Sequence, residues 1–504
     1  MREKEFDVVI VGSGAGGGAV AAELGPLAAT GARVAVLEWG PKVREQEFTG
    51  RELEMANRLY FDRGGVLTRD MSMTMAFGKG YGGSTVVYTG TSLTIPPQVV
   101  TRWNVPGLEA EDVLARSEKY LRQNNVHLLE EPLLNDNNRL FREGCRRLGW
   151  TVEQFPINVK GCLGAGLCNL GCPNAAKQGT NRVQLPAAER QGVQVVTNCK
   201  VERIEESACV VTVRNESFGE PSGWEPGEYR VKAKAIVVAA GAVNSPALLL
   251  RSRLPVELPA LGCYFTAHPA LILVAQHERP ITNYSGHPKS FYCDQFAHSK
   301  RFLLETCMYF PFTTAKSLAG FGADHSRLMS GMDRLQMILA LALDDSRAEN
   351  RVTIDAAGNA VVDYRLSEPV LDALHEAMKA SARIFFAAGA ARVHAPAGSN
   401  FLIEASERHR IDELIPRSGV KPGKVSIVAA HLMGGCRMGT GRGDSVTDSW
   451  GRVHGVPGLY VADASLFPAC AEINPYVTIM ALADRVAEGV RNDLSAPPAS
   501  RRAE

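Results

Sequence analysis

The strand, turn and helix at the start of the chain constrain its fold more than any other feature. Residues 6–25 are FDVVIVGSGAGGGAVAAELG, an apolar run followed by a glycine-rich turn and alanine-rich helix formers. Gly12, Gly14 and Gly17 match G-x-G-x-x-G, in which the glycines allow a tight turn, backbone approach to a pyrophosphate and close helix–strand packing. We predict a Rossmann-type nucleotide site, with Ser13 in the turn and the N–H groups of the helix start facing phosphates.

A second buried strand in residues 32–40, ARVAVLEWG, ends at Glu38. A carboxylate there can accept two ribose hydroxyls and would repel the 2′-phosphate of NADP, although this pattern alone does not choose between NAD and FAD. An exposed glutamate after an ordinary glycine-rich turn is the alternative, which the complete strand–helix–strand order disfavours. Pro26 predicts that the first helix ends or kinks near Gly25.

Similar segments recur further along the chain. Residues 76–92, AFGKGYGGSTVVYTGTS, form a second glycine-rich stretch in which backbone can approach a ligand. Strands rich in Val and Ile are expected over 193–204 and 231–241, the second followed by a short helix. The cofactor contacts predicted in these segments are Gly82, Gly83, Ser84, Val201, Ala240 and Gly241.

Between these segments the sequence is typical of antiparallel structure. We expect a hairpin over 350–366 and an amphipathic helix over 367–390 that is capped by Ser367. The chain is therefore predicted to be α/β (α+β overall), with a Rossmann-type nucleotide-binding domain and a substrate domain built on an antiparallel sheet flanked by helices. The nucleotide-binding domain takes residues 1–95, 190–262 and 429–504, and the substrate lobe takes 96–189 and 263–428. The polar end, residues 495–504, is expected to fray.

The C-terminal part carries candidate chemistry. VSIVAAHLMGGCRMG places His431 between an apolar strand and a glycine-rich turn, although a lone histidine is more often structural. A later strand delivers Asp463 and Ala464, either to a ribityl hydroxyl or to a loop amide. Asn474 and Pro475 then open a long helix, whose positive end would stabilise negative charge on a reduced flavin ring.

Composition excludes several other classes of function. The formal net charge of +1 offers no basic surface for nucleic acid. No apolar run approaches the roughly 20 residues that span a bilayer, and the start of the chain shows no export signal. The eleven cysteines are therefore expected to be reduced thiols or metal ligands, and the protein to be cytoplasmic.

Taken together, the motifs resemble those of the glucose–methanol–choline (GMC) oxidoreductases, flavoproteins that oxidise alcohols. The matching stretches are VVIVGSGAGGG, VAVLEWG, GKGYGGSTVVY, IVVAAGAVNSPALLL, AHPAL, HLMGGCRMG and NPYVTIMALADR. The resemblance implies FAD as cofactor, His431 as the active-site histidine and Asn474 as its partner. The Asn-Pro ending is most similar to the cholesterol-oxidase-like branch and its bacterial relatives. Tyr88 stands where most relatives carry Asn, so the resemblance does not determine whether FAD is attached covalently.

The expected reaction oxidises the CH–OH group of a hydrophobic or bulky alcohol to a carbonyl. His431 takes or orients the hydroxyl proton, a hydride passes to flavin N5, and Asn474 donates to the developing alkoxide unless its side chain caps the helix. Oxygen, a quinone or a protein is the electron acceptor. The alternatives are a non-redox lyase or isomerase on the same fold, and a dehydrogenase subunit that passes electrons through an iron–sulfur cluster to a partner.

Residues 160–177, KGCLGAGLCNLGCPNAAK, form a cysteine-rich loop. Cys162, Cys168 and Cys172 match the ferredoxin pattern C-x2-C-x2-C-x3-C-P with Ala165 at the second ligand position. Three thiolates are able to hold a three-iron cluster, whereas zinc would need a fourth ligand. A structural loop beside the flavin is the favoured interpretation, and the cluster is the alternative.

Overall fold

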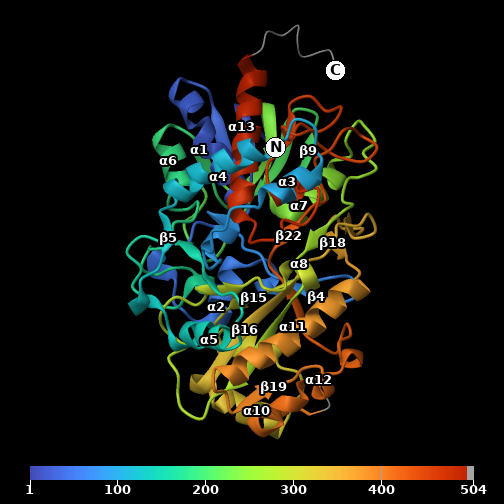
Figure 1. The fold of residues 1–504 in the computed structure, drawn as a ribbon. Helices are drawn as coiled ribbons and strands as arrows, with labels where there is room; N and C mark the ends of the chain where they lie inside the picture. The colour runs from blue at the N-terminus through green and yellow to red at the C-terminus, as the bar shows by residue number, and fades with distance from the viewer. Residues whose placement is uncertain (399, 496–504) are drawn as a thin grey trace.

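The computed structural model describes residues 1–398 and 400–495, so part of the tail predicted to fray lies outside it. Two sheets dominate the fold (Figure 1). The first sheet has seven strands in the order β8-β2-β1-β11-β10-β9, and β23 pairs with β11. The second has ten strands, which run mostly antiparallel. The predicted fold class, a Rossmann-type unit beside an antiparallel sheet, is confirmed.

The nucleotide-binding signature forms the centre of the first sheet. β1 (Arg2–Val11) pairs in parallel with β2 (Val34–Leu37) and β11 (Gly227–Val238), and α1 (Ala15–Ala29) connects β1 to β2. Val8, Val9 and Ile10 are completely buried because helices cover the sheet. Of the two outcomes expected near Gly25, an end or a kink of the helix, the end is wrong, because α1 continues through Pro26 to Ala29.

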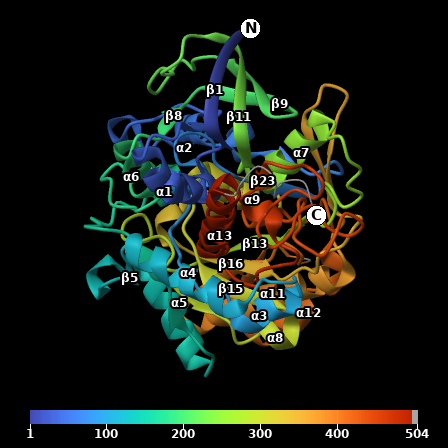
Figure 2. The same ribbon diagram turned by 90° about the horizontal axis from the view of Figure 1, so that it is seen from above.

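The remaining strands of this sheet come from the middle and the end of the chain. β8 (Gln194–Val196) and β23 (Leu459–Val461) extend its parallel part, whereas β9 (Cys199–Glu205) and β10 (Ala208–Val213) are antiparallel. The C-terminal helix α13 (Tyr476–Ser495) packs against α1 and α4 (Ala110–Gln123), as Figure 2 shows. α7 (Gly241–Ser252) follows β11 directly, as predicted.

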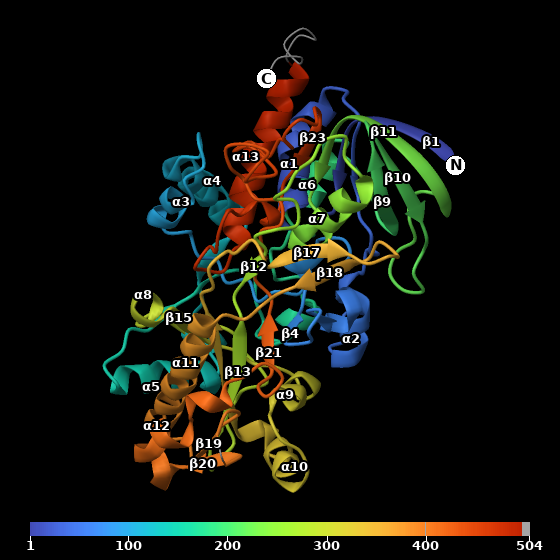
Figure 3. The same ribbon diagram turned by 90° about the vertical axis from the view of Figure 1, so that its right-hand side faces the viewer.

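Long helices cover one face of the second sheet, and its other face, called the ligand-facing side below, lines a cavity. Its central strands are β13 (Ala270–Gln276), β16 (Leu335–Ala342) and β15 (Phe302–Thr306), and α11 (Glu368–Ala387) packs across them together with α5 (Asp136–Arg147). Figure 3 shows these helices on one side of β13 and β21 (Ile427–Ala429), with α2 (Glu52–Leu59) and α9 (Pro311–Ser317) on the other. Ser367 caps α11 as predicted, accepting a bond from the Val370 N–H.

Two short strands near the start of the chain lie in the second sheet. β3 (Val66–Leu67) and β4 (Met73–Met75) pair with each other, and β4 pairs in parallel with β21. The predicted hairpin is present as β17 (Arg351–Ile354) and β18 (Ala360–Asp363), which pack near α7. The first 95 residues thus contribute strands to both sheets.

Candidate active site

A cavity of about 440 Å³ is lined by residues of both sheets. One end is formed by the fingerprint turn, the strand ends of the first sheet and the start of α13. The other end is formed by α2, α9 and the ligand-facing side of the second sheet. The predicted cofactor residues on its wall are Gly12, Ser13, Gly14, Glu38, Gly83, Ser84, Val201, Ala240, Gly241, Asp463, Ala464, Asn474 and Pro475. Gly17 and Gly82 are not among its lining residues, and both pack against neighbouring segments instead.

Glu38 joins the two glycine-rich segments. One carboxylate oxygen accepts the backbone N–H of Ser13 at 3.0 Å and its hydroxyl at 2.6 Å. The other oxygen accepts the N–H groups of Gly40 at 2.9 Å and Gly80 at 3.1 Å. Burial raises the pKa of Glu38, and these four donors oppose that shift. The carboxylate predicted to bind ribose is therefore also the link that holds the fingerprint turn against the second glycine-rich segment.

Asp463 has a comparable position at the end of β23. Its carboxylate accepts the backbone N–H groups of Gly241 and Ser465, each at 2.8 Å, and the hydroxyl of Ser245. Burial raises its pKa, and the same donors oppose the shift. Of the two roles predicted for Asp463, the structure shows the contact with a loop amide. That contact fixes the start of α7 on the cavity wall.

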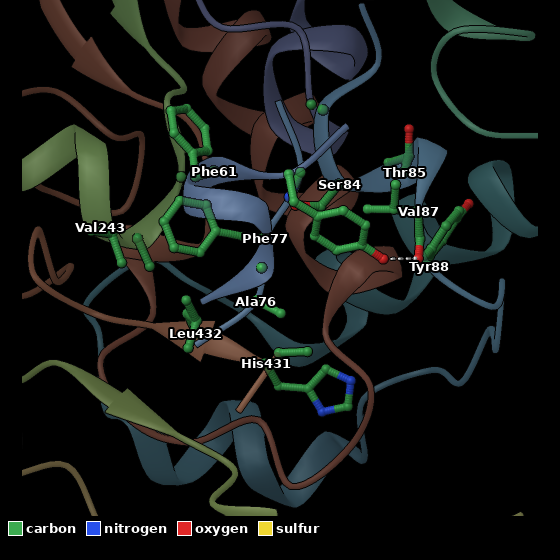
Figure 4. A pocket seen from close by; sticks show the side chains of 18 of the residues that line it. Phe61, Ala76, Phe77, Ser84, Thr85, Val87, Tyr88, Val243, His431 and Leu432 are labelled. Carbon is green, nitrogen blue, oxygen red and sulfur yellow. Dashed lines mark hydrogen bonds between the residues drawn. The ribbon is translucent and has the colours of Figure 1, made fainter. Parts of the chain in front are cut away.

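His431 and Asn474 meet on the wall of the cavity. His431 lies between β21 and β22 (Leu432–Met433), and its Nε2 is 3.2 Å from the Asn474 side-chain nitrogen. Burial and the nearby Lys289 ammonium lower the pKa of His431 to about 3, so its imidazole is neutral near pH 7. α13 begins at Tyr476, and the side chain of Asn474 contacts His431. Figure 4 shows His431 and Leu432 below Phe77 in the same pocket.

Sequence reasoning did not single out three buried residues near His431. His268 lies behind it, with the two Nδ1 atoms 3.0 Å apart. Lys289 lines the cavity and is paired with Glu305, and both are nearly inaccessible to solvent. The AHPAL stretch around His268 was part of the family resemblance, but no pattern indicated that it would reach His431. No spacing in the sequence pointed to the Lys289–Glu305 pair.

The remaining wall toward the second sheet is mostly apolar. Phe61 and Phe77 lie together at one side of the pocket, and Tyr88 and Thr85 lie at the opposite side (Figure 4). Alternate residues of β13 and β16 face the same space, because side chains of a strand point to opposite faces in turn. These strand residues are Ala270, Ile272, Leu339 and Leu341.

Comparison with known proteins identifies the family. Two family models, each described as GMC oxidoreductase, match residues 10–270 and 346–483, which together are most of the chain. The chain belongs to the GMC oxidoreductase family. As a member of this family it is an FAD-dependent oxidoreductase that acts on CH–OH donors.

Similar GMC proteins differ in how much is known of them. A GMC-type oxidoreductase of Mycobacterium tuberculosis, described as uncharacterised, is 31% identical over 96% of this chain and 75% of its own length. A long-chain-alcohol oxidase of Arabidopsis thaliana is 28% identical over 95% of this chain and 66% of its own. Among solved structures, pyridoxine 4-oxidase from Mesorbium loti has a TM-score of 0.72 at 18% identity, covering 97% of this chain and 99% of that one, which shows the shared fold.

The residues of the nucleotide end fit the FAD that GMC oxidoreductases bind. A Cβ on Gly12 would lie 2.4 Å from the Ala239 carbonyl oxygen, and one on Gly17 would lie 2.0 Å from the Gly12 oxygen. Both glycines are therefore required by packing. Gly14 and Gly241 lie on the cavity wall with no atom within 4 Å of a built Cβ. The space beside these two glycines is open to a ligand, as a closely approaching phosphate chain needs.

The cysteine-rich loop of this GMC protein lies beside the same site. Asn169 and Leu170, in the middle of the loop, line the cavity, whereas Cys162, Cys168 and Cys172 surround a separate small void. Burial raises the pKa of Cys168 to about 12, and the pKa of Cys162 is also raised, so both are neutral thiols. Within the described residues, no group of three or more His, Cys, Asp or Glu side chains is arranged to hold a metal ion. The structure thus gives no support to the iron–sulfur alternative.

Proposed function

We propose that this protein oxidises a bulky or long-chain hydrophobic alcohol to the corresponding carbonyl compound, with His431 as the base. The observation that carries the proposal is the neutral His431 beside Asn474 on the wall of a cavity that is apolar toward the second sheet. A neutral imidazole accepts the hydroxyl proton, and an amide N–H stabilises the oxygen as negative charge develops. FAD supplies the acceptor for the hydride that leaves the carbinol carbon.

The cofactor contacts proposed from the sequence have supporting geometry. The turn from Gly12 to Gly14 and the start of α1 would hold the pyrophosphate, and β9 at Val201 would lie against the adenosine part. The start of α13, beside Asn474 and Pro475, would face the pyrimidine side of the ring, where a positive helix end stabilises negative charge. Asp463 would act by holding the Gly241 N–H rather than by accepting a hydroxyl.

Several finer assignments belong to the same proposal. The contact between Asn474 and His431 supports a place in the cholesterol-oxidase-like branch. The division into an FAD domain (1–95, 190–262, 429–504) and a substrate lobe (96–189, 263–428) is supported by most, but not all, strand pairings. A cytoplasmic location is supported by the eleven cysteines, which all fall in the described part of the chain and are all free thiols. No helix in that part is long and apolar enough to cross a membrane.

Anaerobic bleaching of the flavin absorbance tests the proposal. In a panel of long-chain, sterol, aryl and sugar alcohols, we expect the apolar alcohols to bleach the flavin fastest. The variant His431→Asn should bind FAD normally but reduce it at least about 100-fold more slowly, because general-base catalysis contributes about 10²–10⁴-fold. If no alcohol bleaches the flavin, the proposal fails and a non-redox lyase or isomerase replaces it.

The electron acceptor is tested separately. The similar proteins named as alcohol oxidases support oxygen rather than a quinone or a protein. We expect each turnover of substrate in air to release one hydrogen peroxide. Turnover that requires an added quinone or dye, with no peroxide, would make this protein a dehydrogenase instead.

A further inference from the structure

His268 occupies a buried position directly behind His431. β12 (Thr266–Ala267) pairs antiparallel with β22, and the register continued by one residue sets His268 opposite His431. The His268 N–H donates to the His431 carbonyl at 3.3 Å, and the two Nδ1 atoms are 3.0 Å apart. The rings meet edge to face, with centroids 5.1 Å apart. Backbone and side chain together therefore fix this contact.

The positions of the hydrogens follow from what each group is able to donate or accept. The Asn474 side-chain nitrogen only donates, so His431 Nε2 accepts from it. A neutral imidazole that accepts at Nε2 carries its proton on Nδ1, and His431 Nδ1 therefore donates to His268 Nδ1. His268 in turn carries its proton on Nε2, which lies 2.9 Å from Cys470 Sγ. The hydrogen bonds thus run in one direction, from Asn474 through both imidazoles to the Cys470 sulfur.

We propose that His268 is a positioning residue that holds His431 in the Nδ1–H tautomer, so that Nε2 is unprotonated where the substrate hydroxyl arrives. The inference rests on the proposed function of His431. When the substrate hydroxyl arrives, the Asn474 N–H turns from Nε2 to the substrate oxygen, which frees the one lone pair of Nε2 to receive the hydroxyl proton. Both nitrogens of His431 then carry hydrogen, and the positive charge of His431 faces the neutral Nδ1 of His268, which accepts a hydrogen bond. Cys470 acts one step further back, because its sulfur accepts from His268 Nε2 and leaves His268 Nδ1 free to accept.

Burial favours the neutral form of both imidazoles, His268 and His431. Burial and the neighbouring His431 lower the pKa of His268 to about 3, with an opposing effect from Glu305. The other charged group near the pair is Lys289, which lowers the pKa of His431 and is itself paired with Glu305. A second buried histidine elsewhere, His277, bonds Gln336 and does not line the cavity. It serves as a control for the general effect of replacing a buried imidazole.

Two substitutions separate a positioning role from a merely structural one. In His268→Asn, the side-chain oxygen takes the place of Nδ1 and can still accept from His431 Nδ1. In His268→Gln, the side-chain amide takes the place of Nε2 near Cys470, and the acceptor for His431 is lost. We expect His268→Gln to slow anaerobic flavin reduction by about 10–100-fold, the range seen when a metal-bound histidine loses the hydrogen-bond partner that orients it. Substrate affinity should stay within about twofold, and His268→Asn should lose less than about fivefold. His277→Gln should reduce the flavin at the normal rate.

A second measurement reads the tautomer directly. In ¹⁵N spectra of histidine-labelled protein, assigned with His431→Asn, we expect an unprotonated Nε2 on His431 that becomes protonated in His268→Gln. If His268→Gln does not retain FAD, Cys470→Ala supplies the same comparison. An unchanged tautomer, or equal flavin reduction in the Gln and Asn variants, overturns the inference. Normal flavin reduction in His431→Asn would instead overturn the proposed function itself.

Discussion

Replacing Glu38 with Gln tests whether this carboxylate acts mainly on the protein chain or on the cofactor. The amide nitrogen of Gln must take the place of one carboxylate oxygen. If the amide nitrogen took the place of Oε1, it would face the N–H groups of Gly40 and Gly80. If it took the place of Oε2, it would face the N–H and the hydroxyl of Ser13. The Ser13 hydroxyl is able to rotate and accept a hydrogen bond from the amide, so the orientation with nitrogen in place of Oε2 is the better one. It still loses the bond from the Ser13 N–H and the charge that strengthens the others.

The size of the effect follows from these contacts. A hydrogen bond to a charged group contributes about 1.5–3 kcal/mol, and relief of the desolvation that raises the pKa of Glu38 offsets part of its loss. We therefore expect Glu38→Gln to destabilise the FAD-free protein by about 2 kcal/mol. For a cooperative unit of about 200 residues that is a fall of roughly 4–8 °C in the thermal midpoint.

Differential scanning calorimetry of the FAD-free protein measures this fall, and titration with FAD measures the cofactor affinity. Glu257→Gln, at an exposed position, is the matched control and should change neither quantity. A normal thermal midpoint in Glu38→Gln combined with weakened FAD binding would refute the reasoning. That result would mean that the carboxylate serves the ribose hydroxyls, as the sequence alone suggested.

Three further predictions concern the rest of the cavity. Because the pKa of His431 is lowered to about 3, its base form persists well below pH 6.5, and kcat/KM should stay level between pH 8 and pH 6; a loss of activity centred near pH 6.5 would contradict this. Gly14→Ala should leave the thermal midpoint of the FAD-free protein unchanged while weakening FAD binding, whereas Gly17→Ala should lower the midpoint, since only the second Cβ meets a backbone oxygen. Lys289→Met should destabilise the protein by about 3–5 kcal/mol by leaving Glu305 buried and unpaired, and adding Glu305→Gln should recover part of the loss; additive effects in thermal or chemical unfolding would show that the two side chains are not coupled.

The nucleotide end of the molecule was predictable because each of its parts has a local signature. The apolar run, the spacing of Gly12, Gly14 and Gly17, and the strand that ends at Glu38 all lie within 40 residues. Their chemistry was less predictable than their position. Glu38 was expected to meet ribose hydroxyls, and Asp463 either a ribityl hydroxyl or a loop amide. Each carboxylate is bonded to several donors of the chain itself. Which donors a buried carboxylate meets depends on loops that are distant in sequence.

The environment of His431 depends on long-range pairing that no local pattern reveals. His268 lies 163 positions before His431, and a ladder of only two residue pairs brings them together. Strands this short have no alternating pattern long enough to recognise. The same limit applies to β3 and β4, which pair in the second sheet although they follow the nucleotide-binding segments in sequence.

Lys177 explains how the loop rich in cysteine and glycine is held beside the cofactor site. Its buried ammonium donates to the backbone carbonyls of Val86, Tyr88 and Cys168, and its pKa is lowered to about 8 by burial. This one side chain therefore ties the cysteine-rich loop to the segment that carries Tyr88 on the cavity wall. The loop therefore holds the cavity wall in place through the Lys177 ammonium and three backbone carbonyls, while Cys162, Cys168 and Cys172 surround a separate small void.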